Sequence, residues 1–240
     1  MRNQWFFVLY LYPIQNLKNV LPLKRVGVIA FLVLLASCKS TYLDSNKTAV
    51  LLDITKEADE NSFVNLKNYS NDFVFDMKYA TDDNFLKEKV YPCEECYLRV
   101  KTIKSLVIAN KTFIEKGYKI KLFDCYRPLA IQKKMWKIVP DANFVANPKK
   151  GSIHNRGGAV DITLVDSLGI ELNMGTKFDF FGIEASHNYS DFSEEILNNR
   201  KLLKEIMLLN NFQSFDSEWW HYNLDGSKKD KVENLKWRCN

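Results

Sequence analysis

Acidic residues are absent from the first 37 positions of this chain of 240 residues, although the same segment holds four basic side chains. Those four account for most of the formal net charge of +5, because positions 38 to 240 carry 30 basic and 29 acidic residues. The remainder of the chain is nearly neutral and has no basic patch of the kind that binds nucleic acid. We therefore expect no nucleic-acid partner.

Internal repeats and low-complexity tracts are absent as well. The length suits one folded domain with an N-terminal extension, and it is sufficient for a sizeable core. We expect residues 61–240 to form that domain, and the sequence gives no reason for a second one.

The N-terminal region lacks an apolar run long enough to cross a bilayer. The run from Val26 to Leu35 has about half of the roughly 20 residues that a membrane-spanning helix needs. Lys24 and Arg25 precede it and small residues follow, which is the pattern of a signal peptide over residues 1–37. The sequence Leu-Ala-Ser-Cys ending at Cys38 resembles the bacterial lipobox, so we expect cleavage before Cys38 and a lipid on its thiol. An ordinary secretory signal with an incidental cysteine is the alternative.

Residues 39–60 are polar and have no clear periodicity, which is typical of a tether between a lipid anchor and a domain. A second apolar run, Trp5 to Tyr12, is separated from the first by Pro13 and Pro22, so residues 1–23 can also be read as an over-extended gene start. The expected location is outside the cytoplasmic membrane of a bacterium, with the lipid as the contact to the membrane.

Histidine is scarce, and two of the three histidines stand in two short motifs that together suit a metal site. The first motif runs from Ser152 through His154 to Asp161, and the second is Glu218-Trp-Trp-His221. They supply two imidazoles, a carboxylate that can join them on a metal, and a second carboxylate beside the last imidazole. A catalytic zinc site needs three such ligands, an open position for water and a base. The third histidine, His187, matches no ligand position, and we interpret it as structural or exposed.

The local pattern places Asp161 on a strand. Gly157 and Gly158 interrupt any helix after His154, and residues 159–165 then alternate as a strand with Val160, Ile162 and Leu164 toward a core. Each half of the pattern has a plainer explanation: a surface histidine with a turn carboxylate, or a core strand with a satisfied histidine. The second explanation gives no reason for Glu218.

Both motifs resemble those of the zinc D-alanyl-D-alanine dipeptidases. The resemblance extends from Asp76 to Leu224 and includes further motifs in the family's order, namely Lys78-Tyr-Ala-Thr81, Asp83-Asn-Phe85, Asp124-Cys-Tyr-Arg-Pro128 and Met174-Gly-Thr-Lys-Phe-Asp179. Several separate motifs in the correct order are more specific than either half of the metal pattern alone.

The resemblance implies a role for each matching residue. His154, Asp161 and His221 correspond to the ligands of one zinc ion per chain. Glu218 corresponds to the general base that takes a proton from the activated water and passes it to the leaving amine. Arg127, which cannot lose its proton at neutral pH, corresponds to the group that stabilises the oxyanion.

Three further positions correspond to substrate-binding residues. These are Tyr79, Ser152 and Asp179, of which Asp179 would meet the free amino group of the dipeptide. The implied function is zinc-dependent hydrolysis of D-Ala-D-Ala in cell-wall turnover or salvage. Two alternatives stay open: a zinc D,D- or L,D-carboxypeptidase that trims longer peptidoglycan stem peptides, and a non-catalytic peptidoglycan-binding lipoprotein.

The cysteines beyond Cys38 form no second Cys-x-x-Cys pair. A single Cys93-x-x-Cys96 is a weak metal signal, and in an exported protein disulfides are more typical. Cys93 can pair with Cys96, or this loop can be linked to Cys125 or Cys239.

The periodicity of the remaining chain predicts a compact α+β domain with a mainly antiparallel sheet flanked by helices, and with the zinc site at the sheet. We expect a helix over 103–114, a strand over 118–122 that leads to Arg127, and a helix from Pro128 to about Ile138. Asp191 and Glu194 are expected to cap a third helix. Residues 212–224 are expected to form a last strand that carries Glu218 and His221.

Overall fold

The computed structural model describes residues 59–240, except for residues 143, 238 and 240. The predicted signal peptide, Cys38 and nearly all of the predicted tether lie outside this part of the chain. No helix of the described part is both long and apolar enough to span a bilayer.

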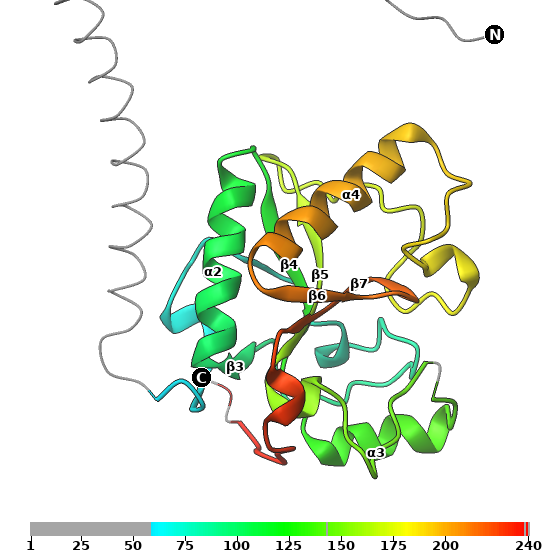
Figure 1. The fold of residues 1–240 in the computed structure, drawn as a ribbon. Helices are drawn as coiled ribbons and strands as arrows, with labels where there is room; N and C mark the ends of the chain where they lie inside the picture. The colour runs from blue at the N-terminus through cyan, green and yellow to red at the C-terminus, as the bar shows by residue number, and fades with distance from the viewer. Residues whose placement is uncertain (1–58, 143, 238, 240) are drawn as a thin grey trace, which may run out of the picture. The chain divides into compact units, whose positions relative to one another are not determined.

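The domain contains a five-stranded sheet in the order β2-β4-β5-β7-β6 and a separate two-stranded sheet of β1 and β3 (Figure 1). Only the pairing of β2 with β4 is parallel, so the prediction of a mainly antiparallel sheet is confirmed. The strands are β1 Phe63–Asn65, β2 Val74–Phe75, β3 Tyr97–Arg99, β4 Lys119–Asp124, β5 Ala159–Val165, β6 Phe212–Phe215 and β7 Glu218–Leu224.

Three α-helices accompany the sheet in the described part of the chain. They are α2 Val100–Ile114, α3 Leu129–Ile138 and α4 Glu194–Leu209. Helix α2 packs against β4 and α4, and α4 also packs against β6 and β7. Figure 1 shows α3 at the opposite end of the domain from α4. Short 3-10 turns occupy Leu66–Asn68, Lys78–Ala80, His154–Arg156, Ile183–Ala185 and Ser227–Lys229.

The three expected helices are present, but the cap predicted for the third helix is wrong. Pro128 immediately precedes α3, where its missing N–H leaves no helical bond unmade. Helix α4 is capped by Ser193, whose Oγ accepts from the Ile196 amide, and not by Asp191. The serine satisfies one of the free amides at the start of the helix, and the two acidic residues of the first turn interact favourably with the helix dipole.

The last expected strand is a hairpin of two strands, β6 and β7. Asp216 and Ser217 form the turn between them, and the pairing of Phe215 with Glu218 includes a register shift. The prediction of one continuous strand over 212–224 was therefore wrong. A strand that reverses here lets β7 enter the sheet between β5 and β6, which brings its polar residues next to β5.

Strand register determines where the polar residues gather. Asp124 on β4 lies opposite Asp161 on β5, and Asp161 lies opposite His221 on β7. Directly paired residues point to the same face of a sheet, so these three form a row across three neighbouring strands. The apolar residues Val160 and Ile162 of β5 point to the opposite face and belong to the buried core of the described residues.

Two disulfides link distant segments. Cys96 is bonded to Cys125 and Cys93 to Cys239, so of the two pairings left open by the sequence, the loop is linked to Cys125 and Cys239 and Cys93 is not paired with Cys96. The Cys96–Cys125 bridge is fully buried, whereas Cys239 is exposed. The buried bridge joins the residue that precedes β3 to the segment that carries Arg127.

Candidate active site

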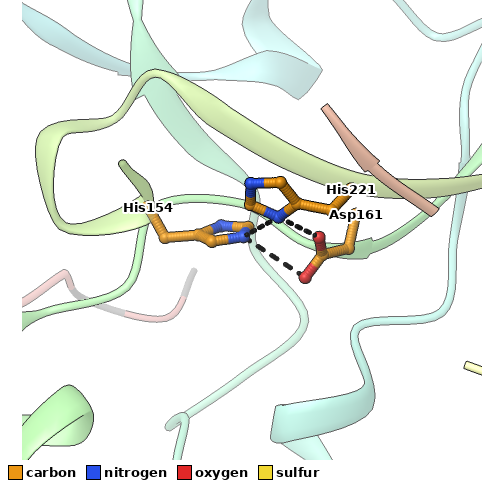
Figure 2. Close-up of side chains that lie close together, drawn as sticks. All are labelled: His154, Asp161 and His221. Atoms are coloured by element: carbon orange, nitrogen blue, oxygen red, sulfur yellow. Dashed lines mark hydrogen bonds and ion pairs between the residues drawn. The ribbon is translucent and has the colours of Figure 1, made fainter. Parts of the chain in front are cut away.

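His154, Asp161 and His221 converge on one point (Figure 2). Their closest atoms are His154 Nε2 and His221 Nδ1 at 3.2 Å, His221 Nδ1 and Asp161 Oδ1 at 2.9 Å, and His154 Nε2 and Asp161 Oδ2 at 3.3 Å. Ligands about 2.0–2.2 Å from a tetrahedral zinc ion lie roughly 3.3 Å from one another. The three side chains are therefore spaced as the ligands of one such ion.

The outer nitrogen of each imidazole has its own acceptor. His154 Nδ1 lies 2.6 Å from the carbonyl oxygen of Cys125, and His221 Nε2 lies 2.9 Å from Oδ1 of Asn223. Because these oxygens can only accept, a proton on each outer nitrogen is stabilised, and in the neutral imidazoles the inner nitrogens would then present lone pairs to a cation. Two lone pairs and a carboxylate then face one point, and a cation satisfies all three.

The glycines after His154 allow this turn to form. Gly157 has φ +68° and follows the 3-10 turn that holds His154, and a Cβ there would collide with the Phe63 ring. A Cβ at Gly158 would collide with Ser227. The glycines are therefore required by backbone conformation and close packing, and they place His154 next to the start of β5.

Electrostatics in the metal-free site reflect the close carboxylates. Burial opposes a charged imidazole at His154, but Asp161 and Asp124 outweigh it and raise the pKa of His154. Burial also opposes ionisation of Asp161, yet the two histidines lower the pKa of that carboxyl. Asp161 is therefore an anion and a competent ligand at neutral pH.

Glu218 lies beside the cluster without joining it. Its Oε2 is 3.9 Å from Nδ1 of His221, and the side chain is largely removed from solvent. Burial raises the pKa of Glu218 to about 7, opposed by His221 and reinforced by Asp161 and Asp179. A carboxylate whose pKa is close to neutral can both accept and return a proton.

Arg127 reaches the same site from the segment after β4. Its guanidinium donates to Asp124 through Nε at 3.1 Å and Nη2 at 2.6 Å, and Nη2 is 4.0 Å from Asp161. Burial would lower its pKa, but the carboxylates of Asp124 and Asp161 hold the pKa well above the usual value. The group is a permanent positive charge next to the cluster.

Asp179 and Tyr79 form the other wall of the site. The Tyr79 hydroxyl donates to both carboxylate oxygens of Asp179, at 3.2 and 3.1 Å. Burial, with a contribution from Asp161, raises the pKa of Asp179 to about 8. Asp179 has φ +59°, an uncommon conformation for a residue with a Cβ, and such strain is often found at binding sites.

The loop that carries Asp179 is fixed from two sides. Arg200 on α4 donates to the carbonyl oxygens of Met174, Glu184 and Ser186 at 2.7 to 2.9 Å. The Trp219 indole donates to Thr176 Oγ1 at 2.8 Å. These bonds hold the loop against α4 and β7, so Asp179 is positioned by rigid elements.

One cavity of about 420 Å³ brings together every predicted site residue of the described chain. Its lining includes Tyr79, Arg127, Ser152, His154, Asp161, Asp179, Glu218 and His221. Phe85, Phe181 and Trp220 add an apolar wall. His187 is not part of the cluster; it is partly buried and lies against Tyr222.

Sequence reasoning missed several residues that support the site. Asn155 accepts from the Ser152 amide and donates to the Arg127 carbonyl at 2.7 Å, which joins the two loops of the site. Asp124 accepts hydrogen bonds from Arg127. Its position three residues before that arginine, in the same motif, could have indicated this contact. Tyr91 and Gln132 are also in this network, and no sequence pattern marked them.

The site therefore has a metal-ligand set, a carboxylate with a pKa near neutrality and a fixed cation, and this combination defines a metal-dependent hydrolase. The family model described as D-ala-D-ala dipeptidase, of the M15 peptidases, matches residues 59–235. The chain belongs to this family, and it is a metallopeptidase.

Several relatives carry the same description. D-alanyl-D-alanine dipeptidase of Escherichia coli (strain K12) is 34% identical over 168 residues, which cover 70% of this chain and 86% of the relative. D-alanyl-D-alanine dipeptidase of Enterococcus faecium is 32% identical over 171 residues, covering 62% of this chain and 85% of the relative. D-alanyl-D-alanine dipeptidase of Enterococcus faecalis (strain ATCC 700802 / V583) is 30% identical over 188 residues, covering 69% of this chain and 92% of the relative.

Proposed function

We propose that this protein is a zinc-dependent dipeptidase that hydrolyses free D-Ala-D-Ala in cell-wall turnover or salvage. The observation that carries the proposal is the shared cavity, in which the His154, Asp161 and His221 cluster faces Glu218, Arg127 and Asp179. The names of the relatives support the choice of substrate.

The donor set suits zinc. Two imidazole nitrogens and one carboxylate are a common ligand set for a catalytic zinc ion, which keeps a further position open. His154, Asp161 and His221 would hold the ion. Bound zinc would supply a Lewis acid that polarises the peptide carbonyl and brings the pKa of water to about 7.

In this proposal Glu218 transfers the protons and Arg127 stabilises the developing negative charge. Glu218 takes a proton from the attacking water and returns it to the leaving amine, a task that suits a carboxyl with a pKa of about 7. Arg127 stabilises the negative charge that develops on the carbonyl oxygen, and its fixed position means that no reorganisation is needed as the charge appears. A non-catalytic wall-binding protein would need neither residue.

Asp179 selects for a free dipeptide. A buried carboxyl held by the Tyr79 hydroxyl lies at one wall of the cavity, where the ammonium group of a short substrate can ionise it and pair with it. A longer stem peptide has an amide at this place and leaves the carboxyl without a charged partner. This feature favours the dipeptidase over a carboxypeptidase.

The proposed location is the outer side of the cytoplasmic membrane, with the protein anchored by a lipid on Cys38. The support is the sequence of residues 24–38 alone, which combines a basic start, a short apolar run and Leu-Ala-Ser-Cys. Outside the membrane the enzyme meets dipeptide released from the wall, so turnover or salvage suits it better than removal of a cytoplasmic precursor.

The test is a panel of three peptides offered to the zinc-loaded protein that starts at residue 39. We expect cleavage of D-Ala-D-Ala and little or no cleavage of L-Ala-L-Ala or of a pentapeptide stem, with His154→Ala as the inactive control. Release of the terminal D-Ala from the pentapeptide at a rate similar to that for the dipeptide would overturn the dipeptidase assignment in favour of a carboxypeptidase.

A further inference from the structure

The hydrogen bonds of Arg127 leave a defined part of its guanidinium for substrate. An arginine side chain has five N–H donors in a rigid plane. Nε and Nη2 donate to Oδ2 of Asp124, and Nη1 donates to Oε1 of Gln132 at 3.0 Å. Among the bonds within the described residues, one N–H on each terminal nitrogen is left over. The orientation of these two depends on the acceptors that hold the other three.

Asp124 is held in turn by Tyr91. The carboxylate is completely buried, and its Oδ1 accepts from the Tyr91 hydroxyl at 2.7 Å and from the Cys125 amide at 2.8 Å. With both oxygens bonded, the carboxylate has one orientation, and Oδ2 is directed at Arg127. Without the hydroxyl, Oδ1 would keep only the adjacent amide, which restrains rotation of the side chain less.

The environment of Tyr91 makes its own position rigid. The ring packs edge-on against Tyr79 at 5.7 Å and against Trp237 at 5.1 Å between centroids, and its backbone amide donates to the Tyr79 carbonyl. Burial strongly raises the pKa of Tyr91, so the hydroxyl keeps the proton that it donates. Tyr91 does not line the cavity, and it therefore acts on substrate only through other residues.

Gln132 restrains the other end of the guanidinium. This fully buried residue of α3 donates from Nε2 to the Ala146 carbonyl at 2.8 Å, which fixes its amide so that Oε1 faces Arg127. Ala146 itself lines the cavity. Gln132 therefore links Arg127 to the loop that forms part of the cavity wall.

We propose that Tyr91 and Gln132 are positioning residues for Arg127, Tyr91 acting through Asp124 and Gln132 directly. The inference rests on the proposed function, in which Arg127 stabilises the oxyanion. A loss of either bond would let the guanidinium turn within its plane or tilt over the Tyr79 ring, whose centroid is 5.3 Å from its Cζ. A small misplacement of a group that acts in the transition state lowers kcat more than substrate binding.

The chain provides a matched pair of substitutions for the test. Tyr91→Phe removes one hydroxyl and keeps the ring, and Tyr222→Phe removes the hydroxyl of another fully buried tyrosine, one for which no hydrogen-bond partner is found among the described residues. We expect Tyr91→Phe to lower kcat for D-Ala-D-Ala about tenfold or more, since displacement of a catalytic group by about 1 Å can cost about 10²-fold. KM and zinc content should stay unchanged, and Tyr222→Phe should match the wild type. Gln132→Leu should likewise lower kcat and leave KM unchanged.

A double-mutant cycle separates positioning from general stability. In an Arg127→Ala background, Tyr91→Phe should have no further effect on kcat, because the residue through which it acts is gone. Equal losses of kcat with and without Arg127 would overturn the proposal, and so would an unchanged kcat in both Tyr91→Phe and Gln132→Leu.

A readout without substrate keeps this inference separate from the proposed function. The Arg127 Nε–H resonance, assigned in an ¹H–¹⁵N spectrum by its loss in Arg127→Lys, should shift in Tyr91→Phe and stay in place in Tyr222→Phe. An enzyme that cleaves no D-Ala-D-Ala would refute the proposed function, and a shifted resonance would then still support the positioning role. An unshifted resonance in Tyr91→Phe would overturn it.

Discussion

Nε2 of His154 and Nδ1 of His221 face each other 3.2 Å apart, and Asp161 lies against both. Two lone pairs at this separation repel each other unless a cation or a proton lies between them. The metal-free protein can reduce the repulsion by protonating one imidazole, which agrees with the raised pKa of His154. A metal ion removes it completely. The two histidines are thus arranged to bind an ion, because without one their facing nitrogens form no favourable interaction unless a proton lies between them.

The first prediction separates ligands from base. His154→Ala, Asp161→Ala and His221→Ala should each lose bound zinc and activity together. Glu218→Gln should keep zinc but lose about 10²–10⁴-fold or more in kcat, because general-base catalysis is removed while the Lewis acid remains. Zinc is measured by mass spectrometry of the dialysed protein. Glu205→Gln, an exposed change on α4, is the control that should retain both properties. A Glu218→Gln protein without zinc would show that Glu218 is itself a ligand.

The second prediction concerns the amino group of the substrate. If Asp179 pairs with a free amine, N-acetyl-D-Ala-D-Ala leaves a buried carboxyl without its partner, and sites of this kind reject such analogues by about 10⁴-fold. Asp179→Asn should reduce the ratio of kcat/KM between the free and the acetylated dipeptide, mainly by losing activity on the free dipeptide. Asparagine tolerates a positive φ well, so the backbone at φ +59° should be kept.

The measurement is kcat/KM for both peptides with wild type and variant. Similar values of kcat/KM for the free and acetylated peptides in the wild-type enzyme would refute the dipeptidase assignment. That result would leave the assignment of His154, Asp161 and His221 as metal ligands intact.

The candidate site could be predicted from sequence because its residues lie in short, ordered motifs. His154 and Asp161 are separated by glycines that only a turn requires, and His221 follows Glu218 at a fixed distance. The helices over 100–114 and 129–138 were likewise marked by periodicity and by Pro128. In each case the sequence pattern and the structure that it produces both lie within one short segment of the chain.

The parts that could not be predicted depend on contacts between distant segments. Cys93 and Cys239 are 146 residues apart, and their pairing follows from the course of the whole chain. The Tyr91 hydroxyl meets Asp124 33 positions away, without any pattern around Tyr91. The turn at Asp216 and Ser217 was missed because the apolar and aromatic residues on both sides suit one strand as well as two.

The third prediction concerns location. If Cys38 carries lipid, the wild-type protein should fractionate with membranes, and Cys38→Ala should move to the soluble exported fraction. Stable anchoring takes more than one acyl chain, so loss of the modified cysteine should release nearly all of the protein. Immunoblots of fractionated cells report the distribution, with Cys239→Ala as a matched control that should stay with the membrane. A Cys38→Ala protein that remains membrane-bound would show that the attachment lies elsewhere.

The last prediction concerns stability and pH at His187. Its backbone amide donates to the Asp216 carbonyl, and its Nε2 is buried without a hydrogen-bond partner among the described residues. Burial, reinforced by Lys204 and Arg200 and weakly opposed by Asp216, lowers the pKa of His187 to about 4.

A histidine with a depressed pKa binds fewer protons in the folded than in the unfolded protein between its two pKa values. The free energy of unfolding should therefore be unaffected by this residue above pH 6.5 and should fall as the pH drops from about 6.5 to about 4, by up to about 3 kcal/mol. In His187→Gln that part of the decline should disappear, while the contributions of the carboxyl groups remain. Urea unfolding of both proteins at pH 4.5, 5.5 and 7.0 measures the difference. Parallel pH profiles for wild type and variant would show that His187 is as easily protonated in the folded chain as in the unfolded one.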